Sequence, residues 1–321
     1  ECGCVRNLLQ TARSGKSLSV FLLLVLMILI DSIVGARLAC HSWNARAFGV
    51  KLGMPIMSTK EEEDSIKVDL HIHTVDDPKD VIDYSAHQLL ERARGLGFGV
   101  LAITLHDAVF DRTEVFADAA SMGILLIPAA EVRLQGADVI VLNVTADEVR
   151  QLKDFDDLRQ LRVRRGSSIF TIAPHPFYVL GGSIGGRLFD EIDCFDAIEF
   201  CHFHHRLLNP NRRAKKVAAK YGKPLIATSD AHRLPAFGRH YTSILRPVVM
   251  TAETVFATLR TGPLRLTSPA ASIVDLLNAI YFIFLAHPFR TWRHRRKQGA
   301  GAVDLDRLGH CGRPPLPARR S

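Results

Sequence analysis

From Ile66 onward, short apolar runs alternate with amphipathic segments at a regular pace. The apolar runs are typical of buried strands, which we expect at 66–72, 100–104, 124–129, 138–143, 169–173, 197–200 and 224–228. The amphipathic segments predict helices at 85–96, 112–122, 155–165, 209–221 and 251–261. This alternation is typical of repeated βα units. It predicts an α/β fold, a closed but imperfect barrel rather than an open sheet.

The segment before this pattern has a different composition. Residues 18–30 are almost purely apolar and follow three basic residues, as in a signal peptide or a marginal membrane anchor. This run is short of the roughly 20 residues that span a bilayer. Met54 and Met57 stand just ahead of a polar run and are natural starts. We expect residues 1–57 to form a hydrophobic leader or anchor, which either belongs to the working protein or precedes its start.

The C-terminal part is apolar first and basic afterwards. An apolar stretch at 276–289 leads into the strongly basic residues 290–297. We expect a domain at 58–270, then a helix with a basic flank at 271–297. This helix either covers the core or lies on an anionic membrane surface. The Gly, Pro and Arg content of 298–321 predicts a disordered basic tail.

Charge and cysteine content narrow the function classes only slightly. The formal net charge is +8, but residues 290–321 contribute +7 and residues 1–57 contribute +4, which leaves −3 for residues 58–289. The basic pI of about 9.3 therefore gives no argument for a nucleic-acid substrate. We interpret Cys194 and Cys201 as reduced thiols, which fits a cytoplasmic protein, with membrane association through the N-terminal segment left open.

Side chains of the kind that bind metals follow five of the expected strands. They are His71 with His73, then His106, Glu131, His175, and Asp230 with His232. His71 and His73 stand at i and i+2 on a strand and therefore point to the same face. A lone histidine is more often a core residue, but a series at strand ends, where barrel enzymes assemble their sites, predicts a site for divalent ions.

Glu131 ends an apolar strand, where an unpaired buried charge would be costly. A metal ion would supply the partner that this carboxylate needs. Gln135-Gly136 is a turn signal that could bring Asp138, at the head of the next run, close to Glu131.

These motifs, taken in order, resemble the PHP (polymerase and histidinol phosphatase) family of metal-dependent phosphoesterases. The matching pieces are Asp-Leu-His-Ile-His-Thr at 69–74, Ala-Ile-Thr-Leu-His-Asp at 102–107, Pro-Ala-Ala-Glu at 128–131, Ala-Pro-His-Pro at 173–176 and Ser-Asp-Ala-His at 229–232. The resemblance covers residues 66–245. It implies a distorted (β/α)7 barrel that holds two or three divalent ions, of zinc, manganese or iron.

The resemblance also implies how the ligands are shared. One ion would be held by His71, His73, Glu131 and Asp230, a second by Glu131 and His175, and a third with the help of His106 and His232. The family supplies one more ligand after the first motif, for which we expect Asp80 rather than Asp77. Asp138 stands where many members have a histidine for the second ion. Leu105 stands where the family commonly has an aspartate, so a carboxylate beside His106 is expected to be missing.

The implied activity is hydrolysis of phosphoesters, of the phosphatase or nuclease type. A metal-bound hydroxide would attack phosphorus in line, and the substrate would be a phosphorylated small molecule, a nucleotide or an oligonucleotide end. His202 is a candidate to contact phosphate or protonate a leaving oxygen, with a polar loop lining as the alternative. Arg239 is a candidate phosphate clamp.

Two other functions fit parts of the pattern. An amidohydrolase-like enzyme that cleaves C–N bonds also begins its barrel with His-x-His, but it should offer a bridging lysine where this chain has Glu131. A degenerate, non-catalytic PHP domain with a regulatory role is suggested by Leu105 and Asp138. The sequence does not predict an oligomeric state.

Overall fold

The computed structural model describes residues 57–58, 61, 63–178, 181–205, 209–272 and 274–275 of the chain. The predicted leader, apart from its last residue, and the predicted tail 298–321 lie outside these residues, as does most of the predicted helix 271–297. The chain divides into two compact units, Glu1–Leu276 and Leu277–Ser321, and the second lies wholly outside the described residues. Among the described residues, no helix has both the length and the hydropathy needed to cross a membrane.

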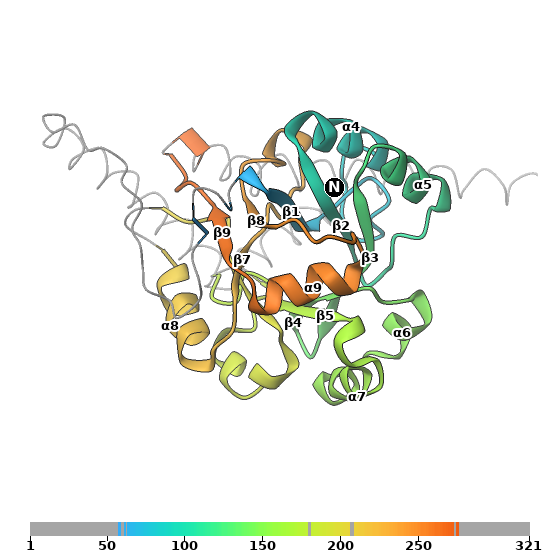
Figure 1. Cartoon of the computed structure of the whole chain (residues 1–321). Coiled ribbons are helices and arrows are strands. Elements are labelled where there is room, and N and C mark those ends of the chain that lie inside the picture. The colour runs from blue at the N-terminus through green and yellow to red at the C-terminus, as the bar shows by residue number, and fades with distance from the viewer. Residues whose placement is uncertain are drawn as a thin grey trace, which may run out of the picture. The chain divides into compact units, whose positions relative to one another are not determined.

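One mixed sheet organises the described part of the chain (Figure 1). Its strands are β1 (Ser65–Ile72), β2 (Phe98–His106), β3 (Leu125–Leu134), β4 (Ala137–Leu142), β5 (Phe170–Ala173), β6 (Ala197–Phe200), β7 (Leu225–Ala227), β8 (Tyr241–Leu245) and β9 (Leu264–Thr267). The order across the sheet is β7-β6-β5-β4-β3-β2-β1-β8-β9. β1, β2 and β3 run parallel, as do β5, β6 and β7, whereas β4, β8 and β9 are antiparallel to their neighbours.

Six α-helices and four short 3-10 helices are described. They are α4 (Ala86–Leu96), α5 (Thr113–Ser121), α6 (Ala146–Gln151), α7 (Phe155–Arg165), α8 (Asn211–Tyr221), α9 (Ala252–Thr261), η1 (Gly166–Ser168), η2 (Gly185–Phe189), η3 (Ile192–Cys194) and η4 (Leu234–Ala236). All seven predicted strands and all five predicted helices are present. The strands β8 and β9 and the helix α6 were not predicted.

The sheet closes into a nearly complete barrel at the ends of its first and seventh strands. Ile72 and Ala231 form a parallel bridge, and the Asp230 N–H donates to the His71 carbonyl at 3.0 Å. Beside it, the Thr242 hydroxyl on β8 accepts from the Ala227 N–H at 2.8 Å and donates to the Ala227 carbonyl at 2.9 Å. The Thr242 side chain therefore satisfies backbone groups of β7 that no neighbouring strand pairs with on this side.

The predicted turn at Gln135-Gly136 is confirmed. Both residues have positive φ, 49° and 88°, as a two-residue hairpin turn with the right twist requires. β4 therefore runs back along β3, and Asp138 lies opposite Arg133 in the register. This antiparallel strand is the main departure from a regular (β/α)7 barrel.

The core has three parts that follow the alternation of side chains along the strands. The barrel interior holds residues such as Val68, Val100 and Ile140, and α9 closes this cluster with Val255 and Phe256. In Figure 1, α9 lies across the strands, on the side where the parallel strands begin. Two outer clusters lie under α4 and α5 and under α6 to α8. The opposite end of the barrel, where the parallel strands finish, carries the polar groups.

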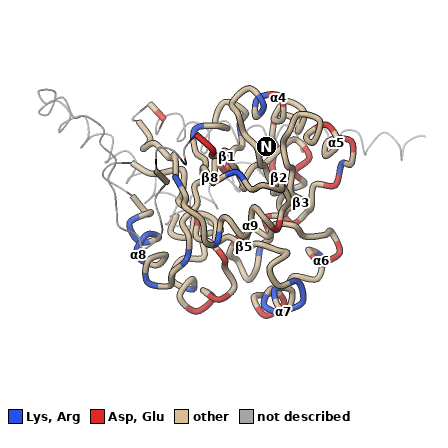
Figure 2. The backbone as a smooth tube through the Cα atoms, viewed as in Figure 1, with Lys and Arg blue, Asp and Glu red and all other residues tan. Residues whose placement is uncertain are grey.

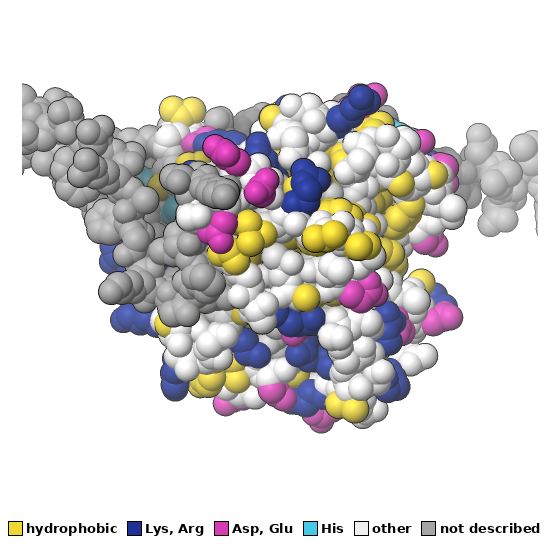
Figure 3. Space-filling view, viewed as in Figure 1, with side chains coloured by type: hydrophobic (Ala, Val, Ile, Leu, Met, Phe, Trp, Pro, Cys, Tyr) yellow, Lys and Arg dark blue, Asp and Glu magenta, His cyan; other side chains and the backbone are white. Residues whose placement is uncertain are grey.

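Charged residues lie mainly on the outer helices and loops, and Lys and Arg are prominent on α7 and α8 (Figure 2). Almost no histidine is visible on the face drawn in Figure 3. This agrees with the burial of His71, His73 and His175. Cys194 and Cys201, interpreted from the sequence as reduced thiols, form no disulfide among the described residues, and both are buried.

Candidate metal centre

A bulge in β1 turns both histidines of the first motif into the barrel. Asp69 pairs with Leu101 and Ile72 with Ile103, so two residues of β1 oppose one residue of β2. The extra residue shifts the alternation of side chains by one position. Leu70 consequently belongs to the interior core, while His71 and His73 also face inward, toward Glu131 and Asp230.

Four donor atoms converge at the carboxyl ends of β1, β3 and β7. Nε2 of His71 lies 3.2 Å from Nε2 of His73, 3.5 Å from Oε2 of Glu131 and 3.3 Å from Oδ1 of Asp230. Nε2 of His73 lies 3.4 Å from Oε2 of Glu131 and 3.5 Å from Oδ1 of Asp230. Ligands about 2.0–2.1 Å from a tetrahedral ion stand about 3.4 Å apart. The four side chains therefore fit a divalent ion in both chemistry and spacing.

The two carboxylate oxygens of Glu131 lie next to different donor atoms. Its Oε2 also lies 3.3 Å from Nε2 of His106, whereas its Oε1 lies 3.4 Å from Nε2 of His175. Donor atoms of Glu131, Asp138 and His175 all lie within 4.8 Å of one another. The two oxygens of Glu131 thus face two different donor sets, and the second includes the predicted Asp138.

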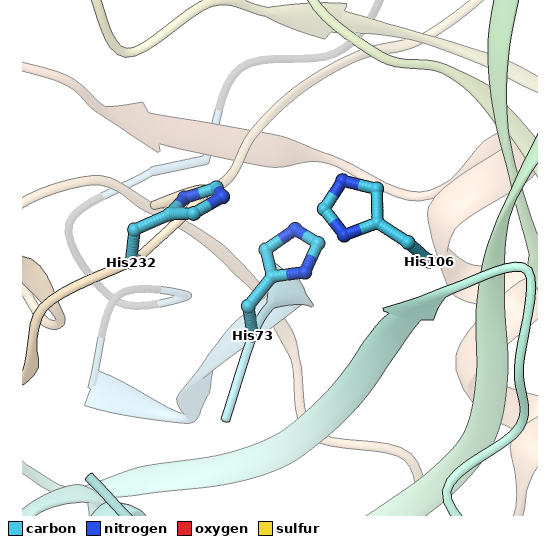
Figure 4. A group of neighbouring side chains, drawn as sticks. All are labelled: His73, His106 and His232. Atoms are coloured by element: carbon cyan, nitrogen blue, oxygen red, sulfur yellow. The ribbon is translucent and has the colours of Figure 1, made fainter. Parts of the chain in front are cut away.

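A third group is formed by His73, His106 and His232, whose nearest ring nitrogens lie within 4.8 Å of one another. Figure 4 shows the three side chains turned toward one another, with His73 between the other two. The His73 ring centroid is 4.5 Å from that of His106 and 4.4 Å from that of His232. The predicted Asp80 lies at the edge of this group, with Oδ2 3.2 Å from Nε2 of His232.

Two buried carboxylates orient the histidines from behind: Asp77, named from the sequence only as the less favoured ligand, and Glu199, to which the sequence assigned no role. Oδ2 of Asp77 lies 3.0 Å from Nδ1 of His73 and 2.8 Å from Nδ1 of His106. Oε1 of Glu199 lies 3.1 Å from Nδ1 of His71. Such contacts fix the tautomer, so that Nε2 is left to face a metal. A carboxylate four residues after His73, and another inside the apolar strand β6, are the sequence signals that could have found them.

Asp77 also changes the interpretation of Leu105. The expectation that His106 lacks a carboxylate partner is wrong, because Asp77 fills that place from the loop after β1. Leu105 is buried in the outer core cluster under α4 and α5. Successive side chains of a strand point to opposite faces, so Leu105 packs in this cluster while His106 faces Glu131.

Opposite charges set the pKa values of the donors. Burial lowers the pKa of His73, but hydrogen bonds with Asp230 and Asp77 outweigh it and raise the pKa to about 9. For His175, burial is likewise outweighed, mainly by Glu131, and its pKa is also raised to about 9. Burial raises the pKa of Glu131, yet the neighbouring histidines hold it well below the usual range. Protons on histidine thus balance carboxylate charge that an ion would otherwise neutralise.

Two of the donors are among the five non-glycine residues with positive φ in the described part of the chain. His175 has φ +28° and Asp230 has φ +45°, in the left-handed region that side chains other than glycine rarely adopt. Each such residue costs on the order of 1–3 kcal/mol and persists where the surroundings impose it. Buried Nδ1 of His175 has no hydrogen-bond partner among the described residues. The strained backbone positions thus carry side chains of the donor groups, His175 and Asp230.

The two predicted catalytic side chains lie in different surroundings. Nδ1 of His202 lies 3.8 Å from Oδ2 of Asp230, so the structure brings His202 to the edge of the donor set. Burial lowers its pKa. Arg239 is directed elsewhere, because its guanidinium forms two hydrogen bonds to the carboxylate of Asp275, at 2.9 and 3.2 Å.

Comparison with known proteins adds a family match. Residues 209–264 match the family PHP_C, described as PHP-associated. The chain is 25% identical, over 157 residues, to "Uncharacterized protein MJ1587" of Methanocaldococcus jannaschii, an alignment that covers 44% of this chain and 84% of the relative.

Two solved structures are similar to this chain at low sequence identity. PsfC from Pseudomonas syringae PB-5123 is 18% identical with a TM-score of 0.51, over 70% of this chain and 99% of that chain. A two-domain protein from Bacteroides vulgatus ATCC 8482, containing a predicted PHP-like metal-dependent phosphoesterase, is 19% identical with a TM-score of 0.48. That alignment covers 63% of this chain and 64% of the other, less than two thirds of its length. The family match over residues 209–264 and the nearly closed α/β barrel both support a domain of the PHP (polymerase and histidinol phosphatase) type in this chain.

Proposed function

We propose that this chain is a metal-dependent phosphoesterase that hydrolyses ester bonds of phosphate. The observation that supports this most directly is the set of four converging donors, with Glu131 turned toward two of the donor groups. Two divalent ions in such a site would supply a water nucleophile at neutral pH and neutralise charge on phosphoryl oxygens. Zinc, manganese and iron all suit a donor set of imidazoles and carboxylates.

We assign the ligands by proximity. His71, His73, Glu131 and Asp230 would hold one ion, and Glu131, His175 and Asp138 a second. His106 and His232 would help to hold a third, with Asp80 beside His232 and His73 close to both histidines. The buried carboxylates of Asp77 and Glu199 would keep the imidazoles in one orientation during turnover. Because these positions are fixed before substrate arrives, little reorganisation is needed in the reaction.

His202 stands at the edge of the first donor group and is the side chain that we propose to meet the leaving group. Its ring is held against His240, with centroids 5.8 Å apart. Burial lowers the pKa of both histidines, that of His240 to about 3. A ring that is neutral near pH 7 can accept a hydrogen bond or relay a proton through water. Arg239 remains a weaker candidate for phosphate contact, since Asp275 engages it.

The substrate class within phosphoesters is open among phosphorylated small molecules, nucleotides and oligonucleotide ends. The amidohydrolase alternative has less support, because Glu131 and not a lysine stands between the donor groups. The degenerate alternative has less support because each donor group keeps three or more side chains.

The test is a turnover screen of the purified chain, loaded with manganese or zinc, against aryl phosphate mono- and diesters, nucleotides and short RNA. We expect hydrolysis of at least one class and its loss in His73→Ala. The matched control is His87→Ala, since His87 is half-exposed on α4 and pairs with Asp118. Full activity in His73→Ala, or turnover of none of these esters by metal-loaded wild type, would contradict the proposal.

A further inference from the structure

Arg133 is a cation on the inner face of the barrel, next to the proposed metal ligands. Along β3, Ile127 and Ala129 belong to the interior core, while Ala130, Val132 and Leu134 belong to an outer cluster. Residues at i and i+2 share a face of a strand. Arg133 is therefore on the same face as Glu131, roughly 7 Å further toward the open end.

The same alternation places Asp138 beside Arg133. Ile140 and Leu142 of β4 belong to the interior core, so Asp138 also faces inward, directly opposite Arg133 in the register. Nε of Arg133 pairs with Oδ1 of Asp138, and Nη2 donates to Oδ2 at 3.1 Å. This fork uses two of the five guanidinium N–H groups, and the side chain is 47% exposed. The other three N–H groups of the guanidinium are therefore not used by Asp138.

Two neighbours fix the fork in position. The backbone N–H of Arg133 donates to Oδ1 of Asp107 at 2.8 Å. A Cβ on Gly182 would lie 1.7 Å from Oδ2 of Asp138 and 3.2 Å from Nη2 of Arg133. Only glycine fits there, also because its φ is +95°. The chain thus makes room for this pair at the mouth of the barrel.

The charges around the site suggest a role for the Arg133–Asp138 pair in binding phosphate. The donor groups are imidazoles and carboxylates, and a phosphate dianion also needs fixed cations. Arg239 and the exposed Lys79 also pair with carboxylates, Asp275 and Asp107, but neither of these carboxylates belongs to a donor group among the described residues. Asp138 lies within 4.8 Å of the donor atoms of Glu131 and His175, which brings the guanidinium next to the proposed second ion site. Each carboxylate oxygen has two lone pairs, so Asp138 can hold Arg133 and still ligate.

We propose that Arg133 is the phosphate-binding residue of this site, held by Asp138, and that it favours terminal phosphate monoesters. A monoester has three non-bridging oxygens and a diester has two. A site that binds the phosphoryl group through ions and through a guanidinium fork therefore suits the monoester better. This proposal rests on the proposed phosphoesterase function for its substrate class, but not for phosphate binding itself.

The experiment measures binding of inorganic phosphate to the manganese-loaded full chain by calorimetry, with the metal content of each variant counted in parallel. We expect Arg133→Ala to weaken phosphate binding about 10- to 100-fold at unchanged metal content, because charge-assisted hydrogen bonds are lost. Arg133→Lys should recover part of the affinity, since it keeps the charge but not the fork. The control is Arg159→Ala, an arginine 35% exposed that pairs with Glu191 and Asp193 on the outside of the barrel.

Turnover of aryl mono- and diesters adds the substrate class. We expect Arg133→Ala to reduce kcat/KM for the monoester more than for the diester, mainly through KM. Unchanged phosphate affinity, or an equal loss for both esters, would overturn the proposal. So would a loss of metal in Arg133→Ala and Arg133→Lys, because the residue would then support the ion site. If Arg133→Ala weakens phosphate binding while wild type hydrolyses none of the esters in the screen, the proposed function is contradicted and the phosphate-binding role of Arg133 is supported.

Discussion

Oδ2 of Asp77 lies 3.0 Å from Nδ1 of His73 and fixes which nitrogen of that ring faces Glu131. Asp77 is buried, and its pKa is lowered because hydrogen bonds with His106 and His73 outweigh the effect of burial. It is therefore ionised and available as an acceptor at neutral pH. The contact makes Asp77 part of the site without direct access to a substrate.

Asp77→Asn should weaken metal binding about 10- to 100-fold without unfolding the protein, since carboxylates behind ligating histidines contribute to affinity on this scale. Titration with zinc against a chelator of known affinity measures the change. Asp76→Asn is the matched control, because the neighbouring carboxylate pairs with Arg112 instead. Equal zinc affinity in Asp77→Asn and wild type would show that Asp77 does not orient the ligands.

Glu199→Gln should destabilise the metal-free protein by about 1–3 kcal/mol, because a neutral amide replaces a buried acceptor of several hydrogen bonds. Glu199 accepts from the His175 N–H and the Thr228 hydroxyl and contacts Nδ1 of His71. Urea unfolding of the metal-free chain gives the difference in free energy of unfolding. The exposed Glu91 on α4 provides the control Glu91→Gln, expected within about 0.5 kcal/mol of wild type. A similar effect of both substitutions would contradict the assigned role.

Gly182→Ala should cost about 1–3 kcal/mol and reduce phosphate affinity, because the new Cβ meets Asp138 and the backbone is left-handed. Gly181→Ala is a close control, since its Cβ would meet nothing within 4 Å. Thermal unfolding and phosphate calorimetry on both variants measure the two effects. Equal behaviour of the two alanine variants would mean that Gly182 does not shape the Arg133 site.

The raised pKa values give the metal-free protein a pH dependence of known sign. His73 and His175 titrate near 6.5 when unfolded and at about 9 when folded. Their stabilisation is therefore complete below about pH 6.5 and is lost as the pH rises through about 9. We expect the Tm of the metal-free protein to decrease as the pH rises from about 6.5 to about 9. Over the same range the apparent manganese affinity should increase, because binding displaces protons from the histidines.

Thermal unfolding across this pH range, with and without manganese, measures that dependence. His73→Ala should show a shallower fall in the metal-free state, because one of the titrating groups is gone. A Tm of the metal-free wild type that stays constant, or rises, from pH 6.5 to 9 would contradict the assigned proton balance.

The sequence predicted that the donor side chains lie close together, because their positions follow from strand ends. Parallel strands finish at one edge of a barrel, so His71, His106 and Glu131 had to meet once their strands were placed. The turn at Gln135-Gly136 likewise followed from local backbone preference and delivered Asp138 to the inner face.

Features that depend on distant partners were not predictable in the same way. Glu199 meets His71 across 128 positions of sequence, and Arg239 meets Asp275 across 36. Asp77 lies in a loop without periodicity, where nothing in the sequence ranks it against Asp80. The β1 bulge, which turns His71 inward, leaves no trace in an apolar strand.

Counting bound metal ions per chain tests the central claim most directly. The purified chain, loaded with manganese or zinc and freed of excess by desalting, is analysed by elemental mass spectrometry beside Glu131→Gln. The donor geometry predicts two or more ions per wild-type chain and fewer in the variant, because Glu131 faces both groups. Fewer than two ions in wild type, or an unchanged count in Glu131→Gln, would contradict this account of the site.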